Sequence, residues 1–175
     1  MKILKRAHIF MVVGPAIAFA YNTCVTITSP IFQDNEYMTE RYTCDGQDKN
    51  PPLKFGEIPQ DAKSLVLVMD DPDAPTGNFA HWLLWNIPPN TEGIKEGELP
   101  LGSVQGKNSA GRIGYIGPCP PIGRAHHYQF KLYALDTILD LPEGGHQNEL
   151  ESRAQKHILE SAQIVGLYAR SSIPR

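Results

Sequence analysis

Two groups of side chains in this sequence could carry chemistry. The first is the acidic run DDPDAP at residues 70–75, in which three carboxylates follow an apolar stretch and two prolines restrict the backbone. The second is formed by His126, His127 and Tyr128, which follow a loop rich in proline and glycine. Such ring donors, together with backbone N–H groups of a glycine-containing turn, can bind an anion such as a phosphate ester. A carboxylate such as Asp71 could orient one of their protons or neutralise an amine of the ligand.

Each group also has a purely structural explanation. The acidic run could be a capped turn with solvated carboxylates, and His81, beside the apolar run WLLW, could be a core histidine with one hydrogen bond. If a strand begins at the second group, His126 and Tyr128 share one face of it and His127 takes the other. His81 belongs to a site only if the fold places it opposite His126 and Asp71.

The first 20 residues have the pattern of a secretory signal peptide. Three basic residues precede an apolar stretch from Ile9 to Phe19, which is too short to span a membrane, and residues 18–20 (AFA) fit the small-x-small cleavage site. We expect cleavage after residue 20, and the alternative is an uncleaved N-terminal anchor. Residues 21–175 then form a single domain, periplasmic or secreted, with no stable membrane insertion.

The charge and motif content of the mature part argues against several classes of function. Removing the first 20 residues leaves 13 basic and 19 acidic side chains, a formal net charge of −6, with no basic run that would bind nucleic acid. No Cys/His cluster of the zinc type is present, and Ser103 and Ser109 lie in no G-x-S-x-G motif. Cys119 could act as a nucleophile with His126, but export favours its oxidation. We therefore expect a non-enzymatic protein without metal or cofactor.

The remaining elements predict a mainly β domain that must position both groups. The runs SLVLVMD and FAHWLLWNI are nearly continuous apolar segments, typical of strands buried on both faces. Residues 88–114 are rich in glycine, proline, asparagine and serine, and predict a long surface loop. One helix against five or more strands predicts a mostly antiparallel β sandwich. We expect strands at residues 24–29, 53–55, 64–70, 79–87, 127–134 and 161–168, and a helix at residues 148–157.

The ordered set of motifs resembles the phosphatidylethanolamine-binding protein family, in particular its exported bacterial, Raf-kinase-inhibitor-like branch. The set comprises DPDAP, HWLLWNIP and GPCPPIGRAHHYQFKLYALD, preceded by YTCDGQDKNPPLKF and followed by HILESAQIVGLY. The resemblance implies a two-sheet antiparallel β sandwich with one helix in the C-terminal region, and a small cavity for phosphate or a phospholipid head group. The ligand-binding residues that it implies are Asp71, Pro75, His81, Gly117, Pro120, Pro121, His126 and Tyr128.

The three cysteines, Cys24, Cys44 and Cys119, all lie in the mature part, and the sequence alone allows three pairings. The resemblance places Cys44 and Cys119 in motif loops that the family fold brings near the cavity. We therefore predict a bond between them, which leaves Cys24 free or intermolecular. Two positions depart from the family's usual pattern, because His127 stands where many relatives have arginine and Cys119 where glycine or alanine is frequent.

The function expected from the resemblance is non-enzymatic binding of phosphate or a phospholipid head group by an exported protein. The alternative is a protein-interaction or inhibitor module that acts through the loop at residues 88–114, the cavity being vestigial. A hydrolase that uses Cys119 or a loop serine is a third hypothesis. Relatives bind kinases, inhibit proteases or act as developmental signals in plants, and an exported bacterial protein would not meet a cytosolic kinase.

Overall fold

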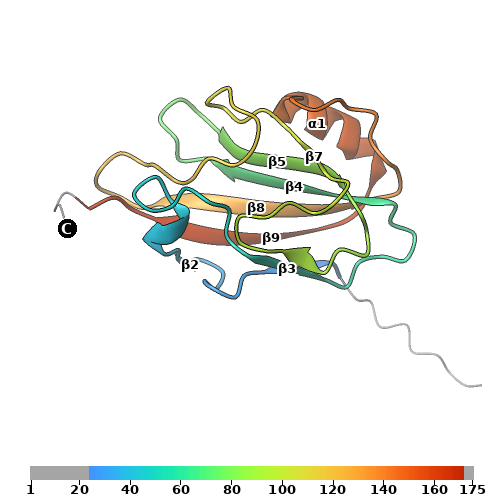
Figure 1. The fold of residues 1–175 in the computed structure, drawn as a ribbon, viewed down its shortest axis with the longest axis horizontal. Helices are drawn as coiled ribbons and strands as arrows, with labels where there is room; N and C mark the ends of the chain where they lie inside the picture. The colour runs from blue at the N-terminus through green and yellow to red at the C-terminus, as the bar shows by residue number, and fades with distance from the viewer. Residues whose placement is uncertain (1–23, 172–175) are drawn as a thin grey trace, which may run out of the picture.

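The computed structural model describes residues 24–171, which contain nine strands and one α-helix (Figure 1). The predicted signal peptide lies outside the described residues. No helix within residues 24–171 has the length and apolar character needed to cross a membrane. The strands are β1 (Thr26–Thr28), β2 (Glu36–Tyr37), β3 (Leu53–Gly56), β4 (Ser64–Asp71), β5 (Phe79–Ile87), β6 (Gly93–Ile94), β7 (Val104–Gln105), β8 (His126–Leu135) and β9 (Ile158–Tyr168).

The strands form two sheets, which confirms the predicted mainly β architecture. The larger sheet has the strand order β2-β9-β8-β4-β5-β7, and the smaller has the order β1-β3-β6. Neighbouring strands are antiparallel, except that β2 runs parallel to β9. The six predicted strands are all present, and that at residues 79–87 has the predicted bounds.

The interpretation of residues 88–114 as a surface loop is partly wrong. This segment contains β6 and β7, which pair with β3 and β5 and so extend an edge of each sheet. Each has only two residues, and a strand of that length shows no detectable alternation of apolar and polar side chains. The strand β2 also has only two residues, and the sequence therefore did not predict it.

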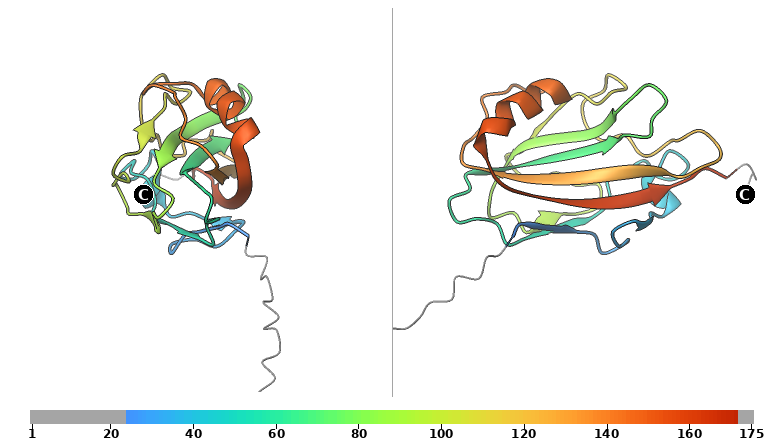
Figure 2. Two further views of the ribbon diagram at one scale, coloured as in Figure 1. Left: turned by 90° about the vertical axis from the view of Figure 1, so that its right-hand side faces the viewer. Right: turned by 180° about the vertical axis from the view of Figure 1, so that it is seen from behind.

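Two apolar cores lie on the two faces of the larger sheet. Successive residues of a strand face opposite sides, so Trp82 enters the core between the sheets and Trp85 enters the core on the other face. Leu150 and Ala154 of α1 (Gln147–Ala154) cover that second core. Figure 2 shows the helix on one side of the larger sheet and the smaller sheet on the other. All eight residues of β4 are buried because both of its faces are covered.

Candidate functional site

The three carboxylates of the acidic run have three different environments. Asp70 and Asp71 end β4 and therefore face opposite sides of the sheet. On the α1 side, Asp70 Oδ2 accepts a hydrogen bond from Lys131 Nζ at 2.8 Å. Asp73 follows the strand and accepts from the backbone N–H of His127 at 2.9 Å, while His127 Nδ1 lies 2.6 Å from the same oxygen. The turn explanation holds for Asp73, whereas Asp71 enters the interior.

Asp71 forms a buried pair with His126. His126 Nδ1 lies 2.7 Å from Asp71 Oδ2, and both side chains are almost inaccessible to solvent. Asp71 Oδ1 accepts a second hydrogen bond, from the backbone N–H of Asp73 at 2.8 Å. An ionised carboxylate can only accept, so the proton of the short contact lies on His126 Nδ1. Asp71 thus orients the imidazole of His126. This agrees with the functional interpretation of the acidic run, in which Asp71 orients the proton of a ring donor.

His81 is held by a backbone carbonyl in the same region. Its Nδ1 lies 2.7 Å from the carbonyl oxygen of Ile116, and its ring meets that of Tyr128 edge-on, with the centroids 5.1 Å apart. Burial lowers the pKa of His81 below its usual value, and the Ile116 carbonyl and the charge of Asp71 oppose this shift only in part. His81 is therefore both a hydrogen-bonded core histidine and a close neighbour of the other site residues.

These side chains line one cavity of about 410 Å³ at the end of β4 and the start of β8. Within residues 24–171, no group of three or more His, Cys, Asp or Glu side chains could hold a metal ion. The cavity contains all eight residues that the resemblance implied, and their role in binding remains a prediction. Its lining consists of Asp71, Ala74, Pro75, Thr76, Phe79, His81, Ile116, Gly117, Cys119, Pro120, Pro121, His126, Tyr128 and Arg170.

The hydroxyl group of Tyr128 is buried without a hydrogen-bond partner in the described chain. Burial raises the pKa of the Tyr128 phenol well above its usual value, and the nearby negative charge of Asp71 raises it further. The Asp71 carboxylate also acts on the phenol as a nearby acceptor, but no hydrogen bond of ordinary length and angle joins the two groups. A buried hydroxyl without a partner costs about 1–3 kcal/mol, so this donor is available to a ligand.

A family model described as phosphatidylethanolamine-binding protein matches residues 28–169. The chain belongs to the phosphatidylethanolamine-binding protein family. It is 46% identical over 177 residues to a UPF0098 protein of Pyrococcus abyssi, and the aligned region covers 97% of this chain and 99% of the relative. It is 48% identical over 144 residues to a UPF0098 protein of Methanothermobacter thermautotrophicus, and the aligned region covers 79% of this chain and 95% of the relative.

Two solved structures of the phosphatidylethanolamine-binding protein family have a similar fold. One is a phosphatidylethanolamine-binding protein homolog from Chlamydia trachomatis, with a TM-score of 0.81 and 37% identity over 85% of this chain and 99% of the other. The second is Escherichia coli YbcL, described as a new member of the mammalian family, with a TM-score of 0.79 and 29% identity over 84% and 99%. Membership of this family supports a binding-type protein.

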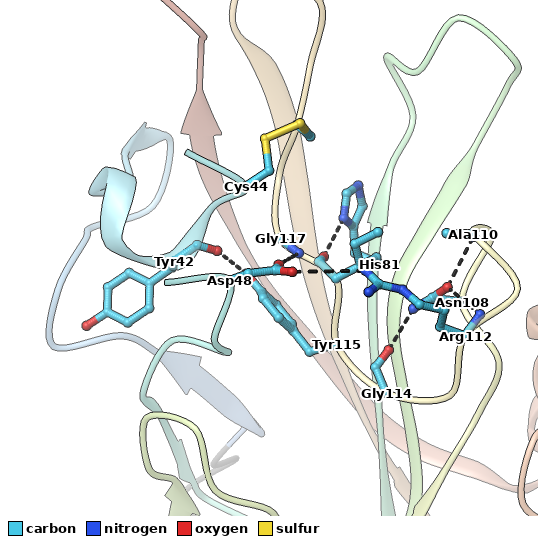
Figure 3. A network of polar contacts seen from close by, with 12 residues as sticks. Tyr42, Cys44, Asp48, His81, Asn108, Ala110, Arg112, Gly114, Tyr115 and Gly117 are labelled. Carbon is cyan, nitrogen blue, oxygen red and sulfur yellow. Dashed lines mark hydrogen bonds and ion pairs between the residues drawn. A yellow bond between two sulfur atoms is a disulfide. The ribbon is translucent and has the colours of Figure 1, made fainter. Parts of the chain in front are cut away.

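In this family member the Gly117 amide does not donate to the cavity, contrary to the expectation of an anion-binding turn. Its N–H donates to Asp48 Oδ1 at 2.6 Å, and Tyr115 donates from its hydroxyl to the Tyr42 carbonyl at 2.6 Å (Figure 3). A Cβ atom at position 117 would lie 2.8 Å from both Asp48 Oδ1 and the Tyr42 oxygen, so only glycine permits this close approach. Gly117 shapes the cavity wall rather than supplying a donor.

The predicted disulfide between Cys44 and Cys119 is confirmed, with the two Cα atoms 5.4 Å apart. Cys44 also donates from its backbone N–H to the Pro118 carbonyl at 3.1 Å. Together the disulfide and this hydrogen bond attach the cavity wall at Cys119 to the early loop that contains Cys44. Cys24 is a free, exposed thiol.

Arg170 is a cavity residue that the sequence analysis missed. Its Nε and Nη2 donate to the carboxylate of Asp45 at 2.9 to 3.1 Å, which leaves Nη1 free of these contacts. Tyr168 donates to the same carboxylate at 2.7 Å. Arg170 is the one arginine or lysine among the cavity-lining residues. No local pattern marks it, because a single arginine after the last strand gains its position only through the sheet.

Proposed function

We propose that this protein binds phosphate or a phospholipid head group in the cavity. The buried, unpartnered hydroxyl of Tyr128 is the observation that carries the proposal, because a ligand oxygen would satisfy it. His81 and His126 line the same cavity, and Arg170 supplies positive charge at its wall. A small anion fits the Tyr128 hydroxyl and the one guanidinium better than an apolar ligand does.

The side chains of the cavity support binding rather than turnover. The Asp71–His126 pair resembles the acid–base pair of hydrolases, but such a pair needs a nucleophile within reach. Cys119 is committed to the disulfide. The Ser103 hydroxyl donates to a backbone carbonyl and that of Ser109 accepts from a backbone N–H, and neither residue lines the cavity. The alternative role for residues 88–114, as an interaction surface, remains a prediction.

Tyr128→Phe should weaken phosphate binding roughly tenfold while leaving the fold intact, because it removes one hydrogen bond to a charged ligand. The free energy of unfolding should stay the same or rise by about 1 kcal/mol, since the lost hydroxyl has no protein partner. Isothermal titration calorimetry with inorganic phosphate and urea denaturation measure the two effects. Tyr133→Phe, on the same strand but facing the second core, is the matched control. Equal phosphate affinity for both variants and the natural protein would contradict the proposal.

We also infer that the protein is exported, to the periplasm or the medium. The disulfide supports this, because such bonds persist in oxidising compartments, and so does the signal-peptide pattern of the first 20 residues. The protein recovered from its native cells should begin at Tyr21. Intact-mass measurement and N-terminal sequencing test this, and a chain that keeps residues 1–20 in the cell interior would contradict it.

A further inference from the structure

A second cavity, of about 510 Å³, lies on the α1 side of the larger sheet. Sites for small molecules commonly have volumes of about 300–1,000 Å³. Val66 and Val68 of β4 line this cavity and face the side of the sheet that α1 covers, opposite to Asp71 (Figure 2). The two cavities therefore lie on different faces of the larger sheet, and they share no described lining residue.

The second cavity has an apolar base and a polar border. Val66 and Val68 are 1% and 0% exposed, and Leu150 of α1 packs with them in the second core. Asn148 and Ser152 line the cavity from the exposed side of the same helix, where residues four positions apart are neighbours. Such a lining suits a small molecule with an apolar body and one polar group better than a purely apolar ligand.

Glu151 gives the second cavity its charge. It is the one charged residue among the described residues that line the cavity, and no lysine, arginine or histidine accompanies it. Its Oε1 accepts a hydrogen bond from Gln147 Nε2 at 2.7 Å, while Oε2 has no hydrogen-bond partner within residues 24–171. The nearby cation on β8, Lys131, is paired with Asp70 at 2.8 Å. The cavity thus presents a carboxylate that no protein cation neutralises.

Tyr133 adds a hydrogen-bond acceptor beside this carboxylate. Its half-buried side chain lines the second cavity, and its hydroxyl makes no hydrogen bond to another described residue. Burial raises the pKa of the Tyr133 phenol, and the nearby negative charges of Glu151 and Asp70 raise it further. The phenol therefore stays neutral near neutral pH, and its oxygen can accept a hydrogen bond. Because both carboxylates act on this phenol, a positive charge is favoured beside it.

We propose that the second cavity binds a small organic amine, in its ammonium form, that carries an apolar body. A primary ammonium group has three N–H donors, which the Glu151 carboxylate and the Tyr133 hydroxyl oxygen can accept. The apolar body packs against Val66, Val68 and Leu150. An anionic ligand would meet Glu151 without a compensating cation and is disfavoured. This inference does not depend on the proposed function, because the phosphate cavity lies on the other face of the sheet.

Three probes with the same phenylethyl body but different charge test the proposal: phenethylamine, 2-phenylethanol and 3-phenylpropionate. The purified protein is titrated with each at constant ionic strength and about pH 7, where the amine is protonated, and two-dimensional NMR follows the binding. Phenethylamine should bind roughly tenfold more tightly than the alcohol, with the largest shifts in α1 and the second half of β8, and the carboxylate should bind most weakly. Equal affinities for amine and alcohol, no binding of the amine, or shifts confined to the cavity at Asp71 would overturn the proposal.

Glu151→Gln separates the charge of the site from its shape. The amide keeps the size of the side chain and can still accept from Gln147, so the fold should be retained. Phenethylamine binding should weaken roughly fivefold, while 2-phenylethanol binding should stay within about twofold of that of the natural protein. Glu149→Gln, on α1 but outside the lining, is the matched control and should leave the amine affinity unchanged. An equal loss in both glutamate variants, or in neither, would contradict the role of Glu151 and overturn the proposal.

Discussion

Replacing Cys44 and Cys119 together by serine should lower the free energy of unfolding by about 4 kcal/mol. The bond joins residues 75 positions apart, so its loss frees a long segment of the unfolded chain and raises the entropy of that state. In the folded protein the bond attaches the cavity wall to the early loop, beside the hydrogen bond from Cys44 to Pro118. We therefore expect phosphate binding to weaken as well, because the wall keeps fewer attachments.

Urea denaturation of the oxidised protein and of the double variant measures the loss of stability. Cys24→Ser is the matched control, because this thiol is free and exposed and its replacement should change the free energy of unfolding by less than about 0.5 kcal/mol. The natural protein in strong reductant should behave like the double variant. If the double variant is as stable as Cys24→Ser, the disulfide does not stabilise the fold.

Lys131→Met should lower the free energy of unfolding by about 3 kcal/mol, because it leaves the buried carboxylate of Asp70 without its cation. Asp70 is 0% exposed, and its Oδ2 accepts from Lys131 Nζ at 2.8 Å, Asn78 Nδ2 at 2.9 Å and Gln147 Nε2 at 3.1 Å. Only the lysine among these donors carries a charge. Its side chain is 23% exposed, so water offsets part of the loss and the effect lies at the lower end of the range for buried pairs.

Urea denaturation at neutral pH compares this variant with Lys54→Met, an exposed lysine on β3 that should tolerate the same change. Methionine keeps most of the aliphatic stem, so the comparison isolates the charge. Adding Asp70→Asn to Lys131→Met should recover much of the loss, since the uncompensated charge is then removed. Equal stability of the two lysine variants would show that the Asp70–Lys131 pair is not required.

Most of the fold was predictable because it depends on local periodicity. The apolar runs that became β4 and β5 are long enough to show burial on both faces. The alternation after residue 126 placed His126 and Tyr128 on one face and His127 on the other, as their burial confirms. The two-residue strands β6 and β7 carry no such signal, so pairing with their neighbours alone makes them strands.

The acidic run and the histidine group were recognisable from the sequence as two candidate halves of one site, by residue type and, as a set, by resemblance to a family. Only the tertiary structure decided which atoms meet. The antiparallel pairing of β4 with β8 places Asp70 opposite Gln129, and so brings Asp71 to His126 across 55 residues of chain. The tertiary structure also places Arg170 at the cavity, and it directs the backbone N–H of Gly117 to Asp48. The spacing of residues in the sequence indicates which side chains share one face of a strand. Contacts between distant strands depend on sheet register and loop attachment, which no local pattern encodes.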